Sequence, residues 1–379
     1  MVNNCNIFTI IIVFLQQTIN ILNLIQLKMK KILLSALLLS VAALGTQAKS
    51  WKIGPSSVNG MDFASINAAV ASDNVAAGDT LYLDQYYNEN QEQTITKQLV
   101  IIGTGYDTSL TDEQVVATLT GSITLKANYI QVKSVRLESN VNIYATDCII
   151  DRCFVSGLIR HQSTTAGMNH IYSCYITGRI EGYNDSNRSM QDIQNCIIIT
   201  NAAQHNINNL TSSIINNNVL YKVFGGNPTN YFCLNGISNS QITNNIINGW
   251  STWNGEHRDY SYDIAASGSG NTIEHNIFGS PSALTYYPTN KIGQRNNWNS
   301  FFVCQGNYSD YYRLATESGD NICRDYATDG GECGCHGGMF GCPSGGRPQY
   351  IPYFSKVVVG SRTENGKLPV SITVKIQDK

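Results

Sequence analysis

The chain of 379 residues repeats a six-residue pattern, first as IDRCFV at residues 150–155, then as IYSCYI at 171–176 and IQNCII at 193–198. Three further copies follow: INNNVL at 215–220, ITNNII at 242–247 and IEHNIF at 273–278. The copies start 21, 22, 22, 27 and 31 residues apart. A unit of about 22 residues is too short for two packed helices, but it accommodates three short strands and three turns.

This period predicts an all-β, right-handed parallel β-helix of about eight to ten three-strand coils. A leucine-rich repeat is excluded because the units carry Ile, Asn and Cys in place of Leu. The fourth position should form a column, in which asparagine adopts the left-handed turn conformation and bonds to the next asparagine, while cysteine fills space inside the core as a thiol. The members of this column are Cys153, Cys174, Cys196, Asn218, Asn245 and Asn276.

Both ends of the repeat show features that would close a β-helix. Residues 62–72 place Phe63, Ile66, Ala69 and Val70 near helical spacing, which predicts a capping helix over the first coil. Residues 371–376 alternate as a half-buried strand, which predicts a small C-terminal β cap, with a separate module or an attachment signal as the alternative. The four cysteines between these ends favour disulfides over free thiols or zinc. They are Cys323, Cys333, Cys335 and Cys342.

Residues 51–310 resemble the right-handed parallel β-helix proteins of the pectin-lyase-like superfamily. The resemblance rests on the helix at residues 63–70, the AGDT stretch at 77–80, the LVIIG strand at 99–103 and the Ile-x-x-Asn units up to Ile277. The superfamily includes polysaccharide lyases, glycoside hydrolases, adhesins and phage tailspikes, so the resemblance implies the fold without selecting an activity.

The N-terminal region is typical of an exported protein. Residues 29–48, MKKILLSALLLSVAALGTQA, combine two lysines, an apolar stretch and a small-residue cleavage pattern, so we expect a secretory signal peptide that starts at Met29 or extends upstream to Met1. We therefore expect three regions in the chain: an extension and signal at 1–48, the β-helix at 49–310, and a Cys/Gly-rich segment with a strand cap at 311–379. We expect no membrane span in the mature chain, and a secreted, periplasmic or outer-surface location.

Two long insertions provide the candidate site. They follow the same strand column, at residues 222–239 and 250–271, and loops from adjacent coils lie side by side. Aromatic faces bind sugar rings and charged groups can perform acid–base chemistry, so we expect polysaccharide as the partner; the alternative is that the aromatics only pack the loops. The expected ligand-binding residues are Tyr231, Trp250, Trp253, His257 and Tyr260, and the expected catalytic residues are Glu256, Arg258 and Asp259.

A second apolar column lies beside the inward one. It contains Phe154, Tyr175, Ile197, Val219, Ile246 and Ile277. Alternation lets only one of two adjacent positions face the core, so this column should form a band on the outer wall. We expect the chain's own insertions or C-terminal strands to cover the band; if they do not, it is an oligomer interface.

Enzymatic signatures are mostly missing. The superfamily's pectate lyases use Ca²⁺-binding aspartate clusters, whereas Asp147, Asp151 and Asp192 fall in non-equivalent columns here, and the polygalacturonase motifs are absent. A net charge of −2 excludes a strongly basic nucleic-acid binder. We therefore expect polysaccharide binding without metal or cofactor, with a lyase (which could use Ca²⁺), a glycoside hydrolase or a structural adhesion protein as alternatives.

Overall fold

The structure is a computed structural model. It describes residues 48–108, 115–163, 167–183, 190–201, 204–223, 232–248, 251–253, 256–258, 269–279, 287–292, 322–341, 353–359 and 370–375, together with Gln16, Leu284 and Gly346. The chain divides into two units, Met1–Ala48 and Lys49–Lys379, and the second holds all the features that follow. Within the described ranges, no helix has the length and apolar character needed to cross a membrane.

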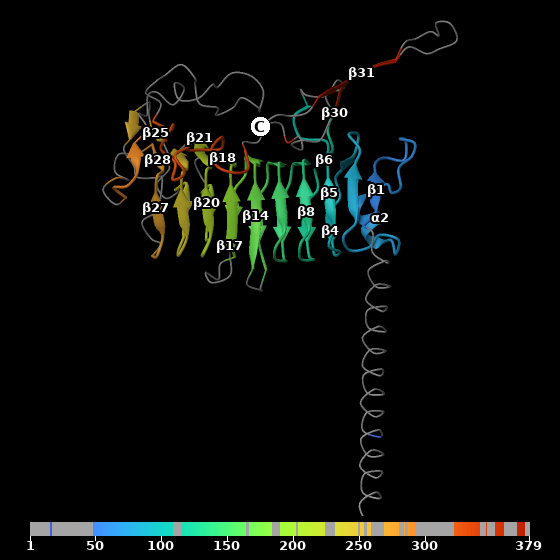
Figure 1. The fold of residues 1–379 in the computed structure, drawn as a ribbon, viewed down its shortest axis with the longest axis horizontal. Coiled ribbons are helices and arrows are strands. Elements are labelled where there is room, and N and C mark those ends of the chain that lie inside the picture. The colour runs from blue at the N-terminus through green and yellow to red at the C-terminus, as the bar shows by residue number, and fades with distance from the viewer. Residues whose placement is uncertain are drawn as a thin grey trace, which may run out of the picture. The chain divides into compact units, whose positions relative to one another are not determined.

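Three sheets of parallel strands form the β-helix of the second unit, and seven successive coils, from the one that begins with β2 to the one that begins with β20, contribute one strand to each sheet (Figure 1). Sheet A contains β1 (Ser50–Ile53), β2 (Thr80–Leu83), β5 (Val100–Ile102), β8 (Gln131–Lys133), β11 (Ile149–Asp151), β14 (Met168–Tyr172), β17 (Met190–Gln194), β20 (Ile214–Asn216), β23 (Gln241–Thr243) and β27 (Thr272–Glu274). Sheet B contains β3 (Asn88–Glu89), β6 (Thr118–Leu119), β9 (Arg136–Leu137), β12 (Phe154–Val155), β15 (Tyr175–Ile176), β18 (Ile197–Asn201), β21 (Val219–Val223), β24 (Ile246–Asn248), β28 (Ile277–Phe278) and β29 (Lys291–Ile292). Sheet C contains β4 (Gln93–Ile95), β7 (Ile123–Leu125), β10 (Val141–Ile143), β13 (Ile159–His161), β16 (Ile180–Glu181), β19 (Ile207–Asn208) and β22 (Leu234–Asn235). The predicted parallel β-helix is confirmed.

The core is a set of aliphatic ladders inside the coils. The first isoleucine of each repeat faces inward from sheet A and pairs with the same position one coil away, as Ile150 does with Ile171 and Ile171 with Ile193. These side chains are fully buried. Because parallel strands lie about 4.8 Å apart, each aliphatic side chain packs on the next along the axis.

A short helix contributes to the core at the N-terminal end. Helix α2 (Ile66–Ala71) begins after Ser65, whose hydroxyl accepts a hydrogen bond from the Ala68 amide. Ile66, Ala69 and Val70 are buried and belong to the same hydrophobic cluster as the first coils. The helix predicted in this region is therefore present, with its apolar face in the core.

The Cys/Asn column forms a hydrogen-bonded ladder. Cys174 Sγ accepts the Cys153 amide at 3.4 Å, and Asn245 Oδ1 accepts the Asn218 amide at 2.9 Å. One element of the prediction was wrong: the left-handed residue is not the column residue but the one before it, for example Asn217 with φ of 54° and Asn244 with φ of 60°. The column side chain instead turns inward, where the thiols of Cys153, Cys174 and Cys196 are fully buried.

The outer apolar band is covered by the chain itself. Residues 322–341, here named the strap, place Cys323, Ala327, Cys333 and Cys335 against the band in a second buried cluster. All six band residues are at most 7% exposed. The chain itself covers the band, as expected, but the described cover is formed by the turns of the strap, whereas the prediction named the insertions or the C-terminal strands. Because the band is buried, it is not an exposed surface for an oligomer interface.

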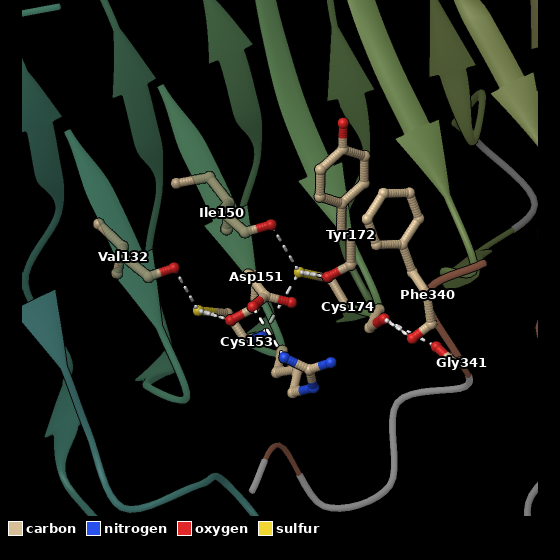
Figure 2. A network of polar contacts seen from close by, with 10 residues as sticks. Val132, Ile150, Asp151, Cys153, Tyr172, Cys174, Phe340 and Gly341 are labelled. Carbon is tan, nitrogen blue, oxygen red and sulfur yellow. Dashed lines mark hydrogen bonds and ion pairs between the residues drawn. The ribbon is translucent and has the colours of Figure 1, made fainter. Parts of the chain in front are cut away.

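The strap is held by the side chains of the left-handed turns. Asn195 Nδ2 donates to the Cys335 carbonyl at 2.9 Å, and Asn217 Nδ2 donates to the Glu332 carbonyl at 3.1 Å. Ser173 Oγ donates to the Gly341 carbonyl at 2.7 Å, a bond that Figure 2 marks at Gly341. The left-handed residues that precede the Cys/Asn column therefore form the turns of their coils and also bind the strap.

The remaining C-terminal features agree with the sequence in part. Cys335 is disulfide-bonded, as predicted for this segment, whereas Cys333 carries a thiol that donates to the His275 carbonyl. Strands β30 (Tyr353–Val359) and β31 (Val370–Lys375) form an antiparallel pair in the region where the sequence predicts a C-terminal β cap.

Candidate functional site

The predicted insertion site is only partly described. Strands β25 (Ser251–Trp253) and β26 (Glu256–Arg258) form an antiparallel hairpin in which Trp253 pairs with Glu256 and Thr252 with His257. The hairpin therefore brings two expected ligand-binding residues and two expected catalytic residues onto neighbouring strands. The other expected site residues lie outside the described part of the chain: Tyr231, Trp250, Asp259 and Tyr260.

The outer face of sheet C carries a polar surface. The register pairs Asn142 with Arg160, Arg160 with Glu181, and Glu181 with Asn208. These residues alternate with the buried Ile159 and Ile180 positions, so they form one outward column along the coils. The repeat itself thus stacks charged and amide side chains about 4.8 Å apart.

Glu181 is shared by two arginines on this face. Its Oε2 lies 3.4 Å from Arg179 Nη2 and 3.6 Å from Arg160 Nη2. The side chains of Arg160 and Arg179 are 41% and 31% exposed, so both guanidinium groups retain donors that face solvent. Two cations and one carboxylate leave the cluster with a net positive charge.

Two hollows flank the arginine–glutamate cluster. The first, of about 290 Å³, is lined by Arg160, Gln162, Glu181, Gly182 and Tyr183. The second, of about 320 Å³, is lined by residues that include Asn140, Ser156, Arg179 and Gln204. Each volume is at the lower end of the range for small-molecule sites.

One exposed tyrosine lines the first hollow, and a second lies beside one of its lining residues. Tyr183 lines it and is 46% exposed. Tyr144, which is 49% exposed, follows the β10 strand and therefore stands beside Gln162 of the next coil. An exposed ring beside guanidinium, carboxylate and amide groups can pack on the apolar face of a sugar while the polar groups bond to its hydroxyls.

The outer face of sheet A carries a second polar cluster. His170 of β14 lies opposite Asp192 of β17, and Tyr172 lies diagonally across from the same aspartate. Tyr172 donates to Asp192 Oδ2, Gln194 Nε2 donates to Asp192 Oδ1 at 2.7 Å, and His170 Nδ1 lies 2.7 Å from the Tyr172 oxygen. Burial opposes the charge of Asp192, but these donors outweigh it and lower the pKa of the carboxyl, so Asp192 is ionised at neutral pH.

The strap closes one side of this cluster. The Phe340 ring stacks on Tyr172 with ring centroids 4.0 Å apart, and the two rings lie side by side in Figure 2. Asp151, paired with Arg152 at 2.9 Å, is the residue opposite Tyr172 on the neighbouring strand. Asp151 and Asp192 do occupy different columns, as the sequence suggested, yet both raise the pKa of Tyr172 in addition to its burial.

Both described clusters were missed from the sequence, although a signal for them exists. Arg160 and Glu181 are 21 residues apart, and His170 and Asp192 are 22 apart, which are the spacings of the apolar repeat. A search for charged pairs at the coil period would have identified them.

Metal ligands and known relatives give no further assignment. Within the described ranges, no group of three or more His, Cys, Asp or Glu side chains is placed to hold a metal ion. Comparison with known proteins gives no match to any family and none to any curated protein.

Proposed function

We propose that this chain is an exported β-helix protein that binds polysaccharide on the outer face of sheet C. The observation that carries the proposal is the Arg179–Glu181–Arg160 cluster, which lies between two hollows with the exposed Tyr183 ring at the edge of one. The coils present this surface without interruption across β10, β13 and β16, so a chain-like ligand can contact several coils at once.

The charge of the cluster favours an acidic glycan. The two guanidinium groups have donors beyond those used by Glu181, and a guanidinium pairs with a sugar carboxylate through two parallel hydrogen bonds. Glu181 and Gln162 supply acceptors for hydroxyl groups. We propose that aromatic residues of the insertions, among them Trp250 and Trp253, also bind the glycan.

Export and superfamily membership are parts of the same proposal. The signal-peptide pattern ends at Ala48, and the structural unit that contains the β-helix begins at Lys49. A parallel β-helix whose first coils share their core with the apolar face of a short helix supports the resemblance to the pectin-lyase-like superfamily. We accordingly propose a secreted, periplasmic or cell-surface location.

Removing both arginines should abolish retention by an acidic glycan. Electrophoresis of the mature protein, residues 49–379, through gels that contain polygalacturonate should show retardation that decreases with added salt. The Arg160→Ala/Arg179→Ala double variant should bind at least about 100-fold more weakly, because it loses two charge-assisted contacts that are each worth roughly 1.5–3 kcal/mol. The matched control is Arg136→Ala, which removes an arginine that pairs with Glu138 away from sheet C.

The same assay separates the alternatives. Retardation of the double variant equal to that of the wild-type protein would reject the sheet C site, and absence of retardation with any glycan would favour a structural adhesion protein. If the protein releases unsaturated products or reducing ends, and the Glu181→Gln variant does not, the protein is an enzyme that cleaves the glycan and not only a binding protein.

A further inference from the structure

The polar cluster on sheet A contains one proton whose position is determined by the hydrogen bonds around it. Tyr172 has a single hydroxyl hydrogen, and it points to Asp192, which is ionised and can only accept. The proton between the Tyr172 oxygen and His170 Nδ1, 2.7 Å apart, must therefore belong to the imidazole. Asp192 Oδ2, 3.3 Å from the same nitrogen, also favours this tautomer.

This tautomer leaves the other ring nitrogen of His170 as a proton acceptor. Nε2 makes no hydrogen bond to any residue in the described part of the chain, and the His170 side chain is 26% exposed. A histidine whose Nδ1–H is oriented by a buried carboxylate, with Nε2 open to solvent, has the arrangement of a general base.

Apolar side chains flank the His170–Asp192 pair. In the outward column, Ile149 pairs with His170 and Ile214 pairs with Asp192, so an isoleucine lies at each end of the pair. Met168 and Met190 occupy the preceding outward positions of the same two strands. All four side chains are partly exposed. The site thus joins an oriented base to an apolar surface, unlike the charged surface of sheet C.

We propose that this face is a second site at which the chain hydrolyses carboxylic esters with a small acyl group, with His170 as the general base. The acyl group contacts the isoleucine and methionine side chains. His170 Nε2 takes a proton from water while the water oxygen bonds to the ester carbonyl carbon. The carbon–alkoxy bond then breaks, the alkoxide receives the proton from Nε2, and the products are a carboxylic acid and an alcohol. Asp192 and Tyr172 are positioning residues.

The first test uses small esters, which need no contact with sheet C. The mature protein should hydrolyse 4-nitrophenyl acetate and 4-nitrophenyl butyrate. His170→Gln should lower the rate by about 100-fold, the range for a lost general base. His205→Gln, a histidine elsewhere on the coils, should keep the wild-type rate. Equal rates for the wild type and His170→Gln would overturn the proposal.

The split between kcat and KM tests the positioning role. The groups that face His170 are Tyr172 on its own strand, Asp192 on β17, and the Asp151–Arg152 pair beyond Tyr172. Asp192→Asn removes the carboxylate that orients the Nδ1–H of His170, so kcat should fall by about tenfold or more while KM stays unchanged. An unchanged kcat in a folded variant would exclude the positioning role of Asp192.

A variant of sheet C separates this proposal from the proposed function. Arg160→Ala/Arg179→Ala should lose glycan retention and keep ester hydrolysis, whereas His170→Gln should do the reverse. Loss of hydrolysis in the sheet C variant would contradict a separate site on sheet A.

Discussion

Replacement of Asn245 by alanine is expected to lower the free energy of unfolding by about 3–5 kcal/mol. The Asn245 side chain is fully buried and accepts the Asn218 amide at 2.9 Å while donating to the Ile215 carbonyl at 2.8 Å. It also donates to Asn276 Oδ1, which continues the ladder into the next coil. Alanine would leave several buried backbone groups without partners, and each costs about 1–3 kcal/mol. Urea denaturation followed by circular dichroism measures the loss.

The ladder itself supplies the control for this prediction. Cysteine does the same task three coils earlier, where Cys174 Sγ accepts the Cys153 amide. Asn245→Cys should therefore lose less stability than Asn245→Ala, because one acceptor remains in place. If both variants were equally unstable, volume and not hydrogen bonding would explain the effect.

Stability should also fall by about 3 kcal/mol between pH 7 and pH 4 because of His161. Its Nδ1 accepts hydrogen bonds from Asn169 at 2.9 Å and Gln191 at 2.6 Å, and the ring is 1% exposed inside the coils. Burial lowers the pKa of His161 from 6.5 to about 4. The unfolded chain therefore takes up a proton near pH 6.5 that the folded chain resists until about pH 4, so stability decreases as the pH falls through this window.

His161→Gln isolates this contribution. Glutamine cannot take up the proton, so the variant should lack the part of the decrease that lies between pH 6.5 and 4. The ionised carboxyls with lowered pKa values, Asp192 and Asp79, lose their contribution only as the pH falls through and below their usual value of 3.8. Thermal unfolding of the wild type and of His161→Gln at closely spaced pH values gives the dependence of stability on pH for each protein. Equal dependences would contradict the assignment of the decrease to His161.

The fold was predictable because the repeat places the same residue type at the same position of every coil. Ile150, Ile171 and Ile193 mark the core, and the period of about 22 residues indicates three strands per coil. The left-handed residue was assigned one position late, since Asn217 and Asn218 are chemically identical and only the backbone separates the turn from the ladder.

The functional surfaces were harder to predict because they depend on pairs that the chain brings together only after coiling. Glu181 lies beside Arg179 in sequence, but its second partner, Arg160, comes from the preceding coil. The His170–Asp192 pair depends in the same way on the register of β14 with β17. The aromatic residues of the insertions stand out in the sequence because several occur close together. Each charged residue of these pairs, in contrast, looks like an ordinary surface residue until its partner is known.

The fold is complete only after the strap, residues 322–341, has been synthesised and has packed on the band. Ser173 bonds to Gly341 across 168 residues, which at about 5–20 residues per second means a delay of roughly 10–30 s between the synthesis of the two partners. During that time the band from Phe154 to Ile277 has no cover, and an uncovered apolar strip is a binding surface for chaperones and for other nascent chains. A chain that ends before residue 322 would keep this strip exposed permanently, so the cell's quality control could distinguish finished from unfinished copies by the strap alone.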